Sequence, residues 1–101
     1  MEISKREREF IRHALGLSNP DSRGVAYRNY YYAGGDDVAI GMALVAKGLA
    51  VHYPPIVSYQ PDDAFMITTR GFEAAAKSGE RLDREESERI RLVDEKAAKA
   101  A

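Results

Sequence analysis

The sequence predicts an α+β fold with three main helices and a small antiparallel β-sheet. Three observations indicate this: a capping box ahead of an apolar stripe, alternating apolar and polar residues around a turn, and glycines placed where helices would end. A single domain is expected over residues 1–79. Residues 80–101 are expected to be a charged tail, either a frayed helix or disordered.

The first helix is expected over Lys5–Leu15. Ser4 and Glu7 form an S-x-x-E capping box, in which each side chain satisfies a backbone N–H of the other residue. Gly16 is placed to end the helix. The helix has one apolar stripe, formed by Phe10, Ile11, Ala14 and Leu15.

The segment Val25–Ala33 is expected to form a strand, because it is rich in tyrosine and poor in helix-forming residues. The loop over residues 17–24 that precedes it contains typical turn formers. Alternation along the strand would place Tyr27, Asn29 and Tyr31 on one face, and Arg28, Tyr30 and Tyr32 on the other.

A second helix is expected after Gly34-Gly35, capped by Asp36 or Asp37 and ending at Lys47. Gly48 stands at the position after a helix where glycine commonly adopts a left-handed conformation. This helix is therefore expected to lead directly into a strand.

A β-hairpin is expected next, with strands at Leu49–Tyr53 and Ala64–Thr68 paired antiparallel around a turn at Gln60–Asp63. Pro54-Pro55 cannot donate to a ladder, so this part is expected at an edge or a bend. Ile56–Tyr59 is expected to continue the first strand.

The third helix is expected to be capped by Thr68 and to end at Gly79. Few large apolar residues follow Glu80, which is why the tail is expected to be dispensable for folding. The expected core consists of Phe10, Leu15, Val45, Leu49, Phe65, Ile67 and Phe72.

The composition excludes several classes of protein. The chain has 101 residues, a net charge of -1 and no cysteine, so disulfides and thiolate metal sites are impossible. We expect a cytoplasmic protein, because the N-terminus lacks the apolar segment of a signal peptide and no apolar run could span a membrane. His13 and His52 show no metal-ligand spacing. Nucleophile and phosphate-loop motifs are also missing, so no catalytic residue, cofactor or metal is expected.

The candidate binding residues lie mainly in the aromatic segment. Tyrosine with a neighbouring arginine can stack on nucleic-acid bases, is enriched in protein interfaces, and can also simply cover a core with its hydroxyl in water. A basic face that joined Arg23, Arg28, Lys47 and Arg70 would favour nucleic acid. The candidates are Tyr27, Arg28, Tyr30, Tyr32, Lys47 and Arg70.

The strings LVAKGLAV and FMITTRGFEAA resemble the second half of winged-helix regulators, where a helix ends in an L-x-x-x-G-L turn, a β-hairpin follows, and an L-T-x-x-G turn opens the next helix. This resemblance implies a winged-helix-like shape. With REFIRHALGL and YRNYYYAG added, the first 80 or so residues are similar to small proteins encoded by bacteriophages and prophages. That similarity implies a phage or prophage origin and no particular activity.

Together these observations predict a non-enzymatic interaction module of phage or prophage origin that binds protein. The alternative is a nucleic-acid-binding accessory factor of winged-helix type. A helix-turn-helix needs two helices before the hairpin, and the segment between Ala33 and Leu49 has room for one. Any nucleic-acid binding is therefore expected to lack sequence specificity, and no membrane partner is expected.

Overall fold

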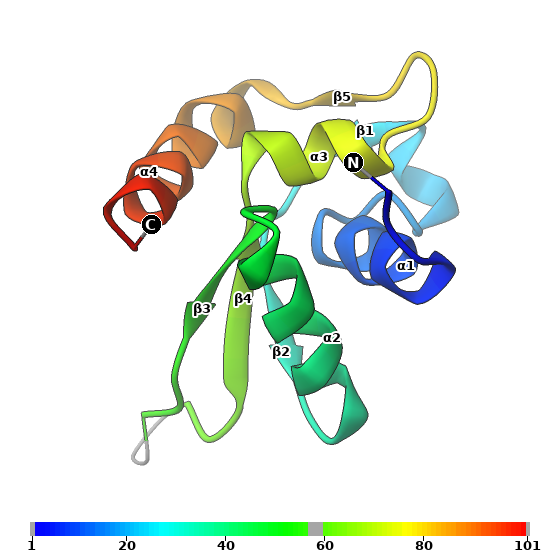
Figure 1. The fold of residues 1–101 in the computed structure, drawn as a ribbon. Helices are drawn as coiled ribbons and strands as arrows, with labels where there is room; N and C mark the ends of the chain where they lie inside the picture. Colours follow the sequence, from blue (N-terminus) through cyan, green and yellow to red (C-terminus); the bar gives the residue numbers. More distant parts are fainter. Residues whose placement is uncertain (1, 57–59, 101) are drawn as a thin grey trace.

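A computed structural model describes residues 2–56 and 60–100, and it confirms the α+β class. The described residues form four α-helices and a small main sheet. Figure 1 shows one hairpin of that sheet running beside one helix, with its tip away from the other helices. The helices are α1 (Lys5–Ala14), α2 (Asp36–Ala46), α3 (Thr69–Ala75) and α4 (Arg84–Ala100), with a short 3₁₀ turn at Pro20–Ser22. The strands are β1 (Val25–Ala26), β2 (Tyr31–Ala33), β3 (Ala50–Tyr53), β4 (Asp63–Ile67) and β5 (Arg81–Leu82).

The main sheet has three antiparallel strands in the order β2-β4-β3. The predicted hairpin is confirmed, since β3 pairs antiparallel with β4. Phe65 is central, because it faces Tyr31 on β2 and His52 on β3. Ile56 makes a bridge to Gln60, while the rest of the expected strand extension, residues 57–59, lies outside the described residues.

The predicted starts of α1 and α3 are confirmed. In α1 the Glu7 N–H donates to Ser4 Oγ at 3.0 Å, and the Ser4 N–H donates to Glu7 Oε1 at 2.7 Å. In α3 the Thr68 hydroxyl oxygen accepts from the Gly71 N–H at 3.1 Å. Both ends follow local sequence rules that need no tertiary contact.

The predicted cap of α2 is wrong. Gly35, with φ 58° and ψ -131°, occupies the N-cap, and it makes no side-chain capping bond. Glycine suits this backbone because an L side chain rarely adopts it. Asp36 and Asp37 lie instead in the first turn, where the helix dipole favours carboxylates. The predicted end is confirmed, because Gly48 has a φ of 75° and its N–H donates to the Val45 carbonyl.

The aromatic segment is a strand only at its two ends. The Tyr30 N–H donates to the carbonyl of Ala14 at the end of α1, at 3.1 Å. Asn29 is buried, and its side-chain amide donates to the Ile67 carbonyl at 2.8 Å and accepts from the Ile67 N–H at 2.7 Å. A side chain thus replaces a strand backbone beside β4, and the continuous strand expected over Val25–Ala33 was wrong.

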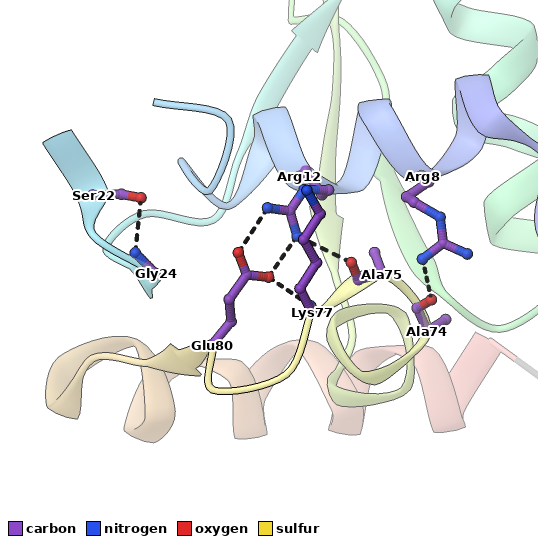
Figure 2. Close-up of polar contacts among 8 residues, drawn as sticks. All are labelled: Arg8, Arg12, Ser22, Gly24, Ala74, Ala75, Lys77 and Glu80. Carbon is purple, nitrogen blue, oxygen red and sulfur yellow. Dashed lines mark hydrogen bonds and ion pairs between the residues drawn. The ribbon is translucent and has the colours of Figure 1, made fainter. Parts of the chain in front are cut away.

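Helix α3 ends at Ala75, earlier than the expected Gly79. Arginines of α1 donate hydrogen bonds to its last carbonyls, so these carbonyls do not need acceptor bonds from a further helical turn. Arg8 Nη1 donates to the Ala74 carbonyl at 3.0 Å, and Arg12 Nη1 donates to the Ala75 carbonyl at 3.1 Å (Figure 2).

Arg12 also joins α1 to the segment that leads into β5. Its guanidinium makes two parallel bonds to the Glu80 carboxylate, at 2.5 and 2.7 Å, and both side chains are only 12% exposed (Figure 2). The hydrogen bond from Arg12 holds the pKa of Glu80 below its ordinary value. Next to this pair, β1 and β5 form a two-stranded parallel ladder that the sequence did not predict.

Residues 84–100 form one continuous helix, α4, rather than the frayed or disordered tail expected from Glu80 onward, and the count of three main helices was therefore too low. Ile90 and Val93 are both 3% exposed. Asp94 accepts from the Thr69 N–H at 2.8 Å and from the Thr69 hydroxyl at 2.6 Å. Two buried apolar residues of α4, together with the hydrogen bonds from Thr69 at the start of α3 to Asp94, thus dock a helix that is otherwise charged.

The core lies between the helices and the main sheet. Five of the seven expected core residues are buried, whereas Val45 and Phe72 are only partly buried against the core. Gly41 lets α2 approach the sheet closely, because a Cβ there would lie 2.5 Å from the Phe65 ring. Among residues 2–56 and 60–100, no helix has both the length and the apolar character needed to cross a membrane.

Candidate interaction surface

Four of the six predicted binding residues form one surface, which we call the tyrosine surface: Tyr27, Arg28, Tyr30 and Tyr32. The three tyrosines are 40%, 47% and 57% exposed, in chain order. The rings of Tyr30 and Tyr32 lie 5.4 Å apart. Tyr27 also has a structural role, because its ring packs over Gly16, where a Cβ would lie 2.5 Å from it.

Arg28 is held in place between two rings of this surface. Its guanidinium carbon lies 5.6 Å from the centroid of Tyr27 and 6.0 Å from that of Tyr30. Its Nη2 and Nε donate to the His13 carbonyl at 2.8 and 3.3 Å. The positive charge therefore sits at the carboxyl end of α1, where the helix dipole favours it, and needs little reordering to meet a partner.

A shallow hollow of about 280 Å³ runs beside β2, lined by His13, Arg28, Tyr30, Tyr31 and Tyr32. A second hollow of about 270 Å³ shares His13 and Tyr31 with it and continues between α1 and α2. The sequence did not single out either of these two shared residues as a binding residue. His13 on α1 and Tyr31 on β2 meet through a tertiary contact, with their ring centroids 5.0 Å apart, so no local pattern could have indicated it.

Tyr31 fixes the inner side of this surface. Its ring stacks on Phe10 with the centroids 4.4 Å apart, and its hydroxyl donates to Asp37 Oδ2 at 2.6 Å. This hydrogen bond, together with burial, raises the pKa of Tyr31 to about 12. Tyr31 is therefore a neutral phenol that supports the strand beneath the exposed tyrosines.

Lys47 and Arg70, the other two predicted residues, lie apart from the tyrosine surface. Lys47 Nζ contacts both carboxylate oxygens of Glu7, at 2.8 and 2.9 Å, and this hydrogen bond lowers the pKa of Glu7. Glu7 and His13 are six residues apart on α1, or about 9 Å along its axis, so Lys47 and Arg28 lie at different ends of that helix.

Arg70 lies at the start of α3, over the Gly48 turn and beside a hollow that Asp94 also lines. The basic face that would favour nucleic acid is therefore interrupted by Glu7 and Asp94.

The sequence also missed a groove of about 520 Å³ along β3. It lies between α2 and α4 and exists because α4 docks on the sheet. Lys96 of α4 lies over the Tyr53 ring at 3.8 Å. The groove is lined by Met42, Val45, Ala46, Gly48, Ala50, Val51, His52, Lys96, Ala97 and Ala100.

No metal centre is visible in the described part of the chain, where no three side chains of the types His, Cys, Asp or Glu gather as a site would need. Comparison of the chain with models of protein families, with curated proteins and with solved structures gives no match. A proposal of function therefore depends on the surface chemistry described above.

Proposed function

We propose that this protein is a non-enzymatic interaction module that binds another protein through the tyrosine surface. A phage or prophage origin, implied by the resemblance of the sequence, is part of the same proposal. The observation that carries it is the pair Tyr30 and Tyr32, whose neighbouring rings are about half exposed. Tyrosine and arginine dominate the energetics of protein interfaces, because each combines a large apolar area with a polar group.

The rigidity of the surface supports this proposal. The backbone of Tyr30 is fixed to α1, Arg28 is fixed to the His13 carbonyl, and β2 is fixed to β4. A partner would therefore bind a preformed patch and lose little free energy to ordering.

Nucleic acid is less well supported as the partner. Lys47 is engaged by Glu7, and α2 contains no basic residue in its bounds Asp36–Ala46. Phosphate contacts come chiefly from unpaired lysines and arginines, so one held arginine offers little electrostatic attraction.

The test is affinity capture with the tagged chain from a lysate of the native host, with and without nuclease treatment. We expect the wild type to retain a specific protein under both conditions. The double variant Tyr30→Ser/Tyr32→Ser should lose it, while Leu92→Ser, at a residue 67% exposed on α4, should retain it. Circular dichroism checks that both variants are folded. Equal capture by the double variant would refute the proposal, and capture that nuclease abolishes would favour nucleic acid.

A further inference from the structure

Hydrogen-bond alternation defines the direction of the backbone groups of β2. Asn29 binds both backbone groups of Ile67, so those groups point from β4 toward β2. Groups of alternate residues in a strand point the same way, so Phe65 also bonds toward β2, with Tyr31 as its partner. Tyr32 therefore directs its N–H and C=O away from β4, toward the outer edge of the sheet.

The end of α1 gives an independent check on this direction. The Tyr30 N–H donates to the Ala14 carbonyl, so it too points away from β4. Tyr32 is two residues further along and shares that direction. Within the described residues β2 pairs with one strand only, and its outer edge is bounded by α1 at Tyr30 and by the turn at Gly34-Gly35.

We propose that the partner bound here is a second copy of this chain, with the two β2 strands paired antiparallel across a two-fold axis at Tyr32. This inference rests on the proposed protein-binding function and names its partner. The two Tyr32 residues would exchange a pair of N–H···O=C bonds, and two three-stranded sheets would become one of six strands. Pairing of this kind removes the unprotected edge that β2 presents.

Side-chain sizes fit this register. With Tyr32 opposite Tyr32 of the partner subunit, Tyr31 faces Ala33 of the partner subunit. The Tyr30 ring lies nearest Gly34 of the partner subunit, where the partner's chain turns away and leaves room for the end of α1 beside Tyr30. The Tyr30 and Tyr31 rings thus meet small residues, and the two Tyr32 rings meet each other at the axis as an aromatic cross-strand pair. Nothing lies within 4 Å of the place where a Cβ of Gly34 would be, so there is room for a ring.

Charge selects the antiparallel direction. Arg28 and His13 line the hollow at one end of the β2 edge. Asp62, with Gln60 and Pro61, lines a hollow of about 360 Å³ at the other end, and both hollows include Tyr32. An antiparallel copy brings Arg28 toward Asp62 of the partner subunit, whereas a parallel copy would bring like charges together.

The test is sedimentation equilibrium over a wide concentration range. We expect the average mass to rise from 11.2 kDa toward twice that value as concentration increases. Tyr32→Pro removes the outward N–H without touching the bonds to β4, and should weaken association about tenfold relative to Tyr32→Val, which keeps the N–H. Asp62→Arg, in an exposed turn, should weaken association at low salt, while the matched change Glu95→Arg on α4 should not.

A wild type that stays monomeric at all concentrations would overturn this inference. So would equal association of Tyr32→Pro and Tyr32→Val, with both shown to be folded. The two proposals can be told apart. If the wild type is monomeric but captures a protein that the double variant Tyr30→Ser/Tyr32→Ser does not capture, the protein-binding proposal stands and only the choice of partner is wrong.

Discussion

Asn29 is the residue that connects the aromatic segment to the main sheet. Its amide makes the two bonds to Ile67 that a strand backbone would otherwise make, and it is only 5% exposed. This arrangement lets the chain leave the strand for four residues and still satisfy β4. The polar groups of Ile67 would otherwise be buried without partners.

Replacing this side chain should therefore be costly. We expect Asn29→Ala to lower the free energy of unfolding by about 1–3 kcal/mol, because it leaves the buried N–H and C=O of Ile67 without hydrogen-bond partners. Asn29→Asp should also destabilise, since its carboxylate cannot donate to the Ile67 carbonyl. Urea denaturation measures both, with Ser18→Ala, at an exposed position, as control. A loss within 0.5 kcal/mol, the range of ordinary surface changes, would show that water replaces the amide.

Two ion pairs should make stability depend on pH in the acid range. The pKa of Glu80 is lowered chiefly by its bond from Arg12, and that of Glu7 chiefly by its bond from Lys47. A carboxyl with a lowered folded pKa contributes stability above its ordinary value of 4.5, and this is lost as pH falls through the folded pKa. The protein should therefore be most stable above that pH and lose stability on acidification.

Glu80→Gln tests the larger of these effects, since the Arg12–Glu80 pair is the more buried. It should cost about 3 kcal/mol at neutral pH, because the guanidinium of Arg12 loses its counter-charge. It should also flatten the fall in stability below pH 4.5. Thermal unfolding across a pH series gives both readings, and Glu95→Gln on exposed α4 surface is the control. An unchanged acid slope would mean that other carboxyls govern it.

At the scale of elements, α4 is held by one apolar side. Ile90 and Val93 are buried, whereas Leu92 on the same helix is 67% exposed. Ile90→Ala with Val93→Ala should cost several kcal/mol, because each leaves a cavity. Leu92→Ala should be near neutral and serves as the matched control in urea titration. If the double variant were as stable as the wild type, α4 would be dispensable, as the sequence had suggested.

Local signals explain which elements were predictable. The capping signals act within a few residues of their own position: Ser4 with Glu7, Thr68, and Gly48. In the structure α1 and α3 begin, and α2 ends, where these residues indicate. The β1–β5 ladder and the docking of α4 depend on residues more than twenty positions apart. Periodicity and capping rules carry no information at that range, so these elements were missed.

The same distinction applies to the candidate surface. Tyr27, Arg28, Tyr30 and Tyr32 are close in sequence and come together. Lys47 was predicted as a binding residue for its charge alone. Its ion pair with Glu7, which is far from it in the sequence, could be known only from the tertiary structure.

For the whole molecule, we expect no sequence-specific binding of duplex DNA at physiological salt. Base edges are read by Arg, Lys, Asn or Gln, and α2 has none of these and begins with two aspartates. Selection from a random duplex library should enrich no motif, and any weak binding should vanish as salt rises, because counterion release would be its only driving force. Recovery of one motif with sub-micromolar affinity would contradict this expectation.

The pairing of β1 with β5 bears on the order in which the protein can fold as it is synthesised. Arg12 and Glu80 are separated by 68 positions, and Gly24 binds Arg81 across a similar span. Until the ribosome has made Glu80 and β5, α1 has neither its counter-charge nor its neighbouring ladder. The nascent chain therefore cannot complete the contacts of α1 and β1 until β5 has been made, and long-range closure of this kind is slow. Until then, β1 and Arg12 lack their native partners, and partly folded chains of this kind tend to associate with one another.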